Sequence, residues 1–384
     1  MDRTSIQQKA DQCVKCGLCL PHCPTYRLYR DEAESPRGRI ALLQGVTSGL
    51  LEADDRLIGH LDNCLLCRRC EGACPSGVEY AAMLDEARTE LTAGRHGRLL
   101  DLLTSKSLLD MALGVGRGIG RFLPKPDGSL LAKLLSLVPQ QKPFSLGTRL
   151  YPALSVPRGH VELFAGCVGR HVDAPALEAL VALLTRQGFS VGVPPDQGCC
   201  GAMHAHAGER EKALLLAESN REAFSGRADA ILVTSSGCGQ QLQQSLECPV
   251  FEATAFLAEH CRFPGLPPES LRNTALYLPC SLDAMQQAGS VRSLFDNIGG
   301  GAMPVIEGFG CCGGAGMHML THPDMAKKLA APVVEKIREE GIETLLTTNS
   351  GCSLHLGRSL SDAGLSVTVM HPLEWLQQQL ESTR

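Results

Sequence analysis

Apolar positions recur at helical spacing in two segments of the first ninety residues. One segment covers residues 40–46 and follows the helix-start sequence Ser-Pro-Arg-Gly-Arg at 35–39, and the other covers residues 80–91. Repeats of three and four residues are typical of amphipathic helices, and proline near a helix start marks its first turn. We therefore predict a helical domain over residues 1–94.

Residues 95–157 have a different pattern. Leucine pairs recur there between Gly and Pro residues, and positions 95–150 hold nine Lys or Arg against three Asp, a local charge of +6. A basic amphipathic segment can lie on a membrane surface or against a partner, but short helices packed on the main body give the same composition. We favour a packed, basic helical connector. The glycine run at 114–120 follows no predicted strand, so it is not expected to bind a nucleotide.

Residues 158–384 alternate short apolar runs with helical patterns, which indicates parallel α/β units. The pattern occurs twice, and matching cysteines are separated by 113, 112 and 114 residues: Cys167 and Cys280, Cys199 and Cys311, and Cys238 and Cys352. We therefore predict an α+β multidomain protein. After the helical domain and the connector come two α/β repeats with parallel sheets, at 158–265 and 266–384.

Eight cysteines in the first eighty residues follow one spacing rule twice. The runs at 13–24 and 64–75 both read C-x2-C-x2-C-x3-C-P. This run holds [4Fe–4S] clusters in two-cluster ferredoxins, where the fourth cysteine binds the other cluster. The predicted ligands of one cluster are Cys13, Cys16, Cys19 and Cys74. The predicted ligands of the other are Cys23, Cys64, Cys67 and Cys70.

The alternatives for these cysteines are zinc sites and a disulfide framework. Zinc sites normally use two pairs of ligands, not triplets with a cysteine before proline. Disulfides fit poorly, because the N-terminal residues lack the apolar core of a signal peptide. Eighteen cysteines, clustered in this way, point to metal binding in a reducing compartment.

Composition excludes few functions but bears on partners. The net charge is −5 over 384 residues, so nothing overall points to nucleic acid. No uninterrupted apolar run is long enough to span a bilayer. We expect a soluble or peripheral protein, in the cytoplasm or on the cytoplasmic face of the inner membrane.

The α/β repeats carry a second set of cysteines at the predicted carboxyl ends of strands, the edge where open α/β sheets bind ligands. Adjacent cysteines cannot bridge each other without severe strain, but they can hold two metal atoms of one cluster. The candidates are Cys167, Cys199, Cys200 and Cys238 in the first repeat, and Cys280, Cys311, Cys312 and Cys352 in the second.

This second pattern resembles the CCG domain, which is shared with heterodisulfide reductase subunits. In that family the pattern ends Cys-x-x-Cys, and five cysteines bind a noncubane iron–sulfur cluster. Here the last position is Gln241 in the first repeat and His355 in the second. His355 remains a candidate ligand because imidazole binds iron and zinc. The alternatives for each repeat are a cluster or zinc site, and thiols that only line a buried interface.

Four histidines follow the two Cys-Cys-Gly loops: His204, His206, His318 and His322. Lone histidines in such places are more often helix-start or surface residues than ligands. Cys248 and Cys261 lack partners at a ligand spacing, and we interpret them as apolar fillers.

The whole chain resembles the iron–sulfur subunits of bacterial glycolate oxidases. The resemblance rests on the order of parts and on short motifs: Ser-Pro-Arg-Gly-Arg at 35–39, Gly-Cys-Cys-Gly-Ala at 198–202, Ser-Gly-Cys-Gly at 236–239, Thr-His-Pro at 321–323 and Asn-Ser-Gly-Cys at 349–352. It covers essentially residues 1–380.

The resemblance implies an electron-transfer subunit without a substrate site of its own. A partner with FAD would oxidise glycolate to glyoxylate, and electrons would pass through two [4Fe–4S] clusters to a quinone or another carrier. Alternatives are the iron–sulfur subunit of a D-lactate or glycerol-3-phosphate dehydrogenase, and a catalytic subunit like that of heterodisulfide reductase. A docking role of the repeats for flavin subunits is compatible with the first hypothesis.

Overall fold

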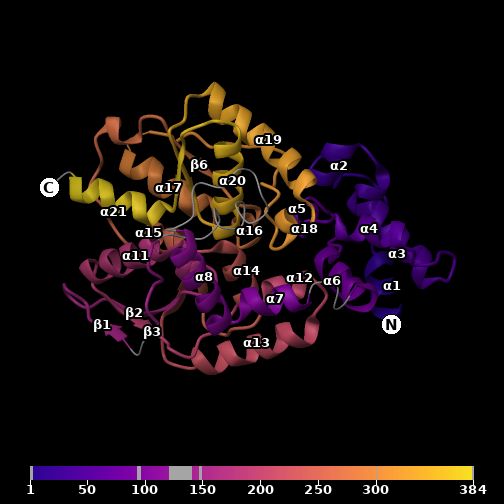
Figure 1. Ribbon diagram of the computed structural model, residues 1–384, viewed down its shortest axis with the longest axis horizontal. Coiled ribbons are helices and arrows are strands. Elements are labelled where there is room, and N and C mark those ends of the chain that lie inside the picture. Colours follow the sequence, from indigo (N-terminus) through magenta and orange to yellow (C-terminus); the bar gives the residue numbers. More distant parts are fainter. Residues whose placement is uncertain (1–2, 93–96, 121–140, 147–148, 300, 383–384) are drawn as a thin grey trace.

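The computed structural model describes residues 3–92, 97–120, 141–146, 149–299 and 301–382. A helical N-terminal part lies at one end of the molecule, and two α/β parts lie beside it, one above the other in Figure 1. The described N-terminal helices are α1 (Arg3–Asp11), α2 (Pro24–Tyr29), α3 (Pro36–Thr47), α4 (Asp55–Asp62), α5 (Arg69–Gly72) and α6 (Tyr80–Leu91), with a 3-10 turn at Glu32–Glu34.

The two helices predicted from apolar spacing are both present, as α3 and α6. The hydroxyl of Ser35 accepts a hydrogen bond from the Gly38 N–H at 2.9 Å and so caps α3, while Pro36 occupies its first position. Leu43 of α3 and Met83 and Leu84 of α6 are fully buried in the core of this part. The capping residue and the apolar spacing therefore explain where these helices begin and how they pack.

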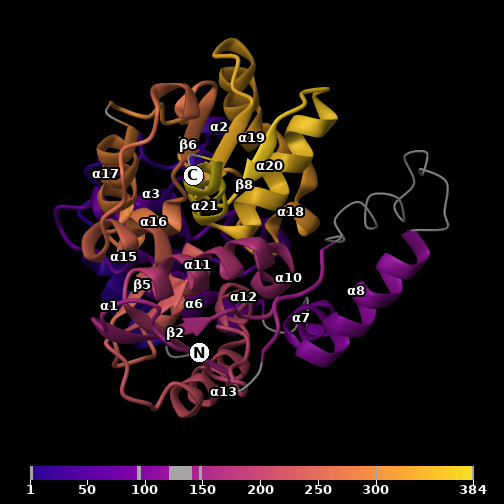
Figure 2. The same cartoon turned by 90° about the vertical axis from the view of Figure 1, so that its left-hand side faces the viewer.

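The connector is helical over residues 97–120, whereas its described residues 141–146 form no helix. It contains α7 (Gly97–Thr104) and α8 (Lys106–Gly120), so the described part of the glycine run lies in a helix and not in a phosphate-binding loop. Figure 2 shows α8 projecting from the main body, and Leu108, Met111 and Val115 are exposed on it. The prediction was wrong at its end, where β1 (Arg149–Tyr151) forms a strand. Residues 121–140 lie outside the described residues.

The first repeat contains a five-stranded sheet in the order β1-β3-β2-β4-β5. Its strands after β1 are β2 (Gly159–Phe164), β3 (Phe189–Val193), β4 (Ala230–Val233) and β5 (Val250–Glu252), and these four are parallel. The strand β1, which comes from the connector, adds an antiparallel edge against β3, while the four strands within the predicted repeat are parallel, as we predicted. Helices cover the sheet: α10 (Gly169–Val172), α11 (Ala174–Arg186), α12 (Ala202–His206), α13 (Arg210–Ala223), α14 (Ser236–Leu242) and α15 (Ala253–His260).

The second repeat contains a parallel sheet in the order β6-β7-β8. Its strands are β6 (Thr274–Tyr277), β7 (Thr344–Thr347) and β8 (Thr368–Met370). Its helices are α16 (Cys280–Ala284), α17 (Ala288–Gly299), α18 (His318–Thr321), α19 (Pro323–Glu339), α20 (Ser350–Asp362) and α21 (Pro372–Ser382), with a 3-10 turn at Pro268–Leu271.

The predicted strand before Cys311 is reduced to one bridge between Leu276 and Val305. Pro304 beside it has no N–H to donate, which shortens the ladder. The bridge still lies against β6, as β3 lies against β2. The two repeats therefore share one strand order, and the duplication predicted from the cysteine offsets is present in the fold.

The two repeats share a core. Leu163 and Leu177 of the first repeat and Phe295 and Trp375 of the second belong to one buried apolar cluster, and the last two rings lie 5.6 Å apart. The packing is reciprocal, because α21 packs on α11 and α15 packs on α17. The repeats are therefore held together as one body, and they lie side by side in both Figure 1 and Figure 2. No described helix has both the length and the apolar character needed to cross a membrane.

The turn between α12 and α13 joins the first repeat to the helical part. Gly208 has a φ of +76°, and a Cβ there would lie 2.5 Å from the Arg88 carbonyl oxygen. Gly364 has a nearly equal φ of +72°, but a Cβ at that position would meet no described atom within 4 Å. Substituting Gly364 would introduce backbone strain alone, whereas substituting Gly208 would also introduce a steric clash between domains.

We predict that Gly364→Ala lowers the free energy of unfolding by about 1–2 kcal/mol, the cost of a left-handed alanine. Gly208→Ala should cost a further 1–3 kcal/mol or so, because its Cβ overpacks the interface with α6. Calorimetric Tm values of the two variants test this under anaerobic conditions. Equal losses in both variants would contradict the packing argument.

Candidate metal centres

The first predicted cysteine set lines a single cavity of about 40 Å³ near the surface. Its members, the outer set, are Cys13, Cys16, Cys19 and Cys74, and Cys70 also reaches this cavity. The loop turns at Lys15 and Gly17, whose φ values are +57° and +84°. Cys16 is exposed, so this set lies at the outer side of the helical part.

The other predicted set lines a second cavity of about 20 Å³. Its members, the inner set, are Cys23, Cys64, Cys67 and Cys70. The loop turns at Leu66 and Arg68, with φ values of +48° and +58°, at the same two places of the motif as in the outer set. Neither residue is glycine, and bulky residues adopt this conformation only where the surroundings enforce it. Both loops are therefore shaped alike, and three cysteines converge in each.

Burial distinguishes the inner set from the outer one. Desolvation raises the pKa of the Cys67 and Cys70 thiols well above the usual range. Thiolates in such a place need a bound cation or nearby positive charge. The donor set and the burial therefore fit a sulfur-ligated metal group in each cavity.

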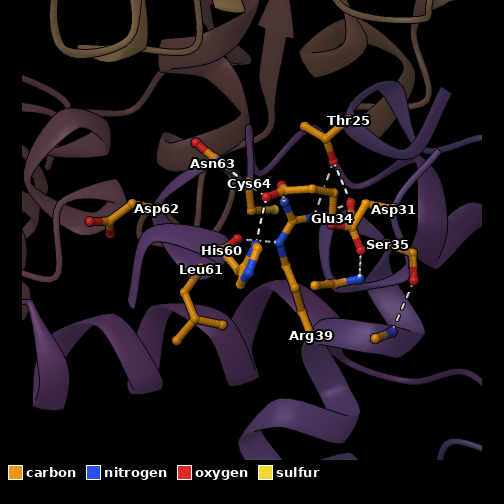
Figure 3. Close-up of polar contacts among 12 residues, drawn as sticks. Thr25, Asp31, Glu34, Ser35, Arg39, His60, Leu61, Asp62, Asn63 and Cys64 are labelled. Carbon is orange, nitrogen blue, oxygen red and sulfur yellow. Dashed lines mark hydrogen bonds and ion pairs between the residues drawn. The ribbon is translucent and has the colours of Figure 1, made fainter. Parts of the chain in front are cut away.

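A buried arginine lies beside Cys64 of the inner set, as Figure 3 shows. The Arg39 side chain is fully buried, and its guanidinium donates to Glu34 Oε2 at 2.5 Å and to Thr25 Oγ1 at 3.1 Å. Cys23 Sγ lies 3.2 Å from that hydroxyl. Burial lowers the pKa of Arg39, but Tyr80, Cys64 and Glu34 outweigh it and raise the pKa. This guanidinium places a permanent positive charge beside two of the four inner cysteines.

Glu34 is in turn held by three partners. Arg39 binds one carboxylate oxygen, while His60 Nδ1 lies 2.7 Å and Asn63 Nδ2 2.9 Å from the other. Tyr80 completes the surroundings by donating to Cys64 Sγ at 3.6 Å. The Ser-Pro-Arg-Gly-Arg sequence thus supplies both the cap of α3 and the arginine at the inner set.

Four cysteines of the first repeat converge where strands end, as predicted. Cys167 follows β2, Cys199 and Cys200 follow β3, and Cys238 lies in the first turn of α14 after β4. We call these four the first tetrathiol. Cys167 and Cys199 have their sulfurs 3.4 Å apart, and Cys200 contacts both Cys199 and Cys238. The hydrogen bond to Cys199 and burial together raise the pKa of the Cys167 thiol.

The second repeat builds an equivalent group, the second tetrathiol, from Cys280, Cys311, Cys312 and Cys352. Cys312 and Cys352 have their sulfurs 3.0 Å apart, and Cys280 contacts Cys311. The hydrogen bond to Cys311 and burial raise the pKa of the Cys280 thiol. His355 lies in the same helix as Cys352, but its Nε2 contacts the Ala326 carbonyl oxygen at 3.1 Å. Its imidazole also bonds to the backbone of Cys312, so it lies beside the second tetrathiol with backbone groups as its partners.

Family models match all three parts of the chain. A 4Fe-4S dicluster domain matches residues 9–78, and a cysteine-rich domain matches residues 161–243 and again 274–357. The glycolate oxidase iron–sulfur subunit of Escherichia coli strain K12 is 32% identical, over 96% of this chain and 94% of its own length. The chain belongs to the family of glycolate oxidase iron–sulfur subunits.

Two further relatives show the breadth of this family. The probable glycolate oxidase iron–sulfur subunit of Bacillus subtilis strain 168 is 30% identical, over 92% of this chain and 90% of its own length. A subunit of the fumarate reductase (CoM/CoB) of Methanothermobacter marburgensis is 31% identical, over 96% of this chain and 72% of its own length. Similarity along most of the chain therefore extends to proteins named for different reactions.

The two tetrathiols of this family member differ in their neighbours. Cys280 and Cys311 of the second tetrathiol lie in one apolar cluster with Cys67 of the inner set and with Leu65. Arg69 Nη2 donates to Asp283 Oδ2 at 3.0 Å and ties α5 to α16. The apolar cluster around the first tetrathiol contains only residues of its own repeat, among those the structure describes. The duplication is therefore symmetric in fold and asymmetric in its contact with the inner set.

The histidines after the Cys-Cys-Gly loops correct one expectation. His318 begins α18, as expected, but both His204 and His318 are buried and not at the surface. His204 contacts Glu209 Oε2 at 2.7 Å and Thr104 Oγ1 at 2.9 Å. Asp101 approaches this group, and the ammonium of Lys212 lies 2.7 Å from Asp101 and 3.2 Å from Glu209, so lysine supplies the positive charge.

Cys261 is buried in the shared core, which confirms its role as an apolar filler. Cys248 packs beside the first tetrathiol and points to the Ala228 carbonyl at 3.5 Å. Sequence reasoning missed Arg39 as a site residue. Its signal was a basic residue in a helix whose neighbours on the same face are apolar.

We predict that Arg39→Met destabilises the protein by about 3–5 kcal/mol, because Glu34 would remain as an uncompensated buried charge. Arg56→Met is the matched control, since Arg56 is exposed on α4 and its loss should change stability by less than about 0.5 kcal/mol. Thermal unfolding of both variants, purified anaerobically, measures the difference. A loss for Arg39→Met no larger than that of the control would contradict a structural role of the pair.

Proposed function

We propose that this chain is the electron-transfer subunit of a glycolate oxidase complex. A partner subunit with FAD would oxidise glycolate to glyoxylate, and this chain would pass the electrons to a quinone or another carrier. The observation that carries the proposal is the pair of cavities, each lined by all four cysteines of one predicted set. The names of the two glycolate oxidase relatives supply the substrate.

Each set would hold one [4Fe–4S] cluster, a group that takes up and releases single electrons. Cys13, Cys16, Cys19 and Cys74 would ligate the outer one, and Cys23, Cys64, Cys67 and Cys70 the inner one. Arg39 and Tyr80 would act on the inner set, because a fixed positive charge and a donated hydrogen bond both stabilise added negative charge on sulfur ligands.

The exposure of the outer set and the burial of the inner set indicate which end of the proposed electron-transfer path faces solvent. Cys16 is exposed beside Val14 and Leu18, which are 69% and 56% exposed, so the outer set can meet a partner. Cys67 lies at the opposite, interior side and packs with Cys280. Exposed apolar residues around an exposed ligand are typical of a docking surface. We assign the outer set to exchange with another subunit and the inner set to transfer within the chain.

Helix α8 supports a peripheral contact with the cytoplasmic face of the inner membrane. It projects from the body (Figure 2), and its exposed Leu108, Met111 and Val115 form an apolar face. An amphipathic helix of this kind can lie in the membrane interface without spanning it.

A second candidate function is thiol–disulfide chemistry at the tetrathiols. It is favoured by the relative named fumarate reductase (CoM/CoB) and by the four converging sulfurs of each repeat. Four thiolates would also suit a tetrahedral zinc ion or a further cluster. The first candidate needs only the outer and inner sets to be loaded, whereas a tetrathiol that carries a cluster would add iron to this content.

We predict that Cys16→Ser in the complex with its flavin partner leaves flavin reduction by glycolate unchanged and reduces turnover with a quinone to background. Removing one ligand of the outer set would interrupt the path, while substrate oxidation takes place on the partner. Stopped-flow absorbance of the flavin and steady-state assays measure the two steps. Cys248→Ser is the control, because Cys248 belongs to neither set. Normal turnover in Cys16→Ser would refute the proposal.

We predict about eight iron atoms per chain in anaerobically purified protein, the content of two [4Fe–4S] clusters. Elemental analysis for iron and zinc, with EPR of the reduced form, makes the measurement. Cys19→Ser and Cys280→Ser serve as paired variants, and only the first should lose iron. Iron well above this value, lost again in Cys280→Ser, would instead favour the thiol–disulfide function.

A further inference from the structure

A cavity of about 70 Å³ lies where the helical part and both repeats meet. Cys64 and Arg88 line it from the helical part, His206 from the first repeat, and His318 from the second. It belongs to neither cysteine cavity, although Cys64 of the inner set reaches it. A ligand held here would touch all three parts of the chain.

The cavity presents polar nitrogens that have no hydrogen-bond partner among the described residues. His318 is 6% exposed, and both of its ring nitrogens are unpartnered in this part of the chain. The same holds for His206 Nδ1 and Arg88 Nε, while other guanidinium nitrogens of Arg88 donate to the carbonyls of His206, Leu61 and Cys64. Buried polar groups in native proteins are nearly always satisfied, so these nitrogens indicate a bound molecule.

The potential at this place is positive. Burial lowers the pKa of His206 to about 4, and Arg88 and Arg68 act in the same direction. Burial also lowers the pKa of His318 to about 3, together with His322 and Arg88. Asp62 is also in the lining, but it does not appear among the charges that act on either imidazole. The donors therefore favour an anion.

Size and lining restrict the anion further. A water molecule needs about 10–15 Å³ of such cavity volume, so a cavity of about 70 Å³ fits roughly five to seven water-sized groups. Leu65, Leu66, Met203 and Met317 supply apolar lining beside the nitrogen donors. A tetrahedral inorganic oxyanion would leave this apolar lining unused, whereas a carboxylate with a short carbon chain would use both kinds of surface.

We propose that this cavity is a binding site for a carboxylate of two or three carbon atoms. The carboxylate oxygens accept from His318, His206 and Arg88 Nε, and the carbon end packs on the apolar lining. Because Cys64 lines the same cavity, the bound charge lies beside the inner set. A negative charge there would oppose the addition of an electron and would lower the reduction potential of the cluster that the inner set would hold.

Isothermal titration calorimetry on the intact, anaerobically purified subunit tests the site with glycolate, glyoxylate, acetate and phosphate in an amine buffer. We expect one site for the carboxylates and weaker binding of phosphate. His318→Gln should weaken carboxylate binding about tenfold or more, because a flexible amide replaces the fixed imidazole donor to a charged ligand. His260→Gln is the matched control, because His260 is exposed at the end of α15.

A second variant keeps the test independent of the histidine. Ala207→Leu fills the cavity from the first repeat and should also weaken binding. Phosphate binding as tight as glycolate, or carboxylate binding unchanged in both variants, would overturn the proposal. An EPR redox titration adds a second readout. Glycolate should lower the reduction potential of the cluster at the inner set in the wild type and leave it unchanged in His318→Gln. The calorimetry needs no partner and no electron transfer, so its failure leaves the proposed function standing.

Discussion

The arrangement of the helical part depends on a positive charge that is buried away from solvent. Arg39 is fully buried beneath Cys23 and Cys64, and its charge is balanced by Glu34. Burying such a pair is costly unless every donor and acceptor is satisfied. Here Thr25, the Glu34 and His60 carbonyls, His60 and Asn63 satisfy it. These partners come from α2, the turn before α3 and the end of α4, so one ion pair fixes the elements that carry the inner cysteines.

This constraint also explains what could and could not be predicted from the sequence. The cysteine spacing, the cap at Ser35 and the apolar face of α6 are local signals, and each reappears where it was predicted. Arg39 is far from Cys64 in sequence, so its local signal, a basic residue among apolar neighbours on one helix face, does not show which cysteines it lies beside. His318 was named as a helix-start or surface residue, and its burial could not be predicted because its surroundings come from three separate parts of the chain. The strand predicted before Cys311 from its apolar residues forms only one bridge, because a proline interrupts the ladder of hydrogen bonds.

The duplicated repeats show how one fold can give two sites different neighbours. Both tetrathiols lie after equivalent strands, and both use glycines with positive φ after the cysteine pair, at Gly201 and Gly313. The second lies against the inner set, since Arg69 and Asp283 join α5 to α16. The first faces the helical part through Gly208 and His206, whose backbone contacts Arg88. Two equivalent cysteine groups therefore differ in their contact with the inner set.

Arg88 connects these observations. Its guanidinium donates to carbonyls at the end of α4, at Cys64 and at the last residue of α12, so it holds the inner loop and the first repeat together. One nitrogen remains for the cavity between the domains. Arg88 therefore contacts the loop of Cys64 and lines the cavity with the same side chain. In our proposal, this side chain links occupancy of the cavity to the charge at the inner set.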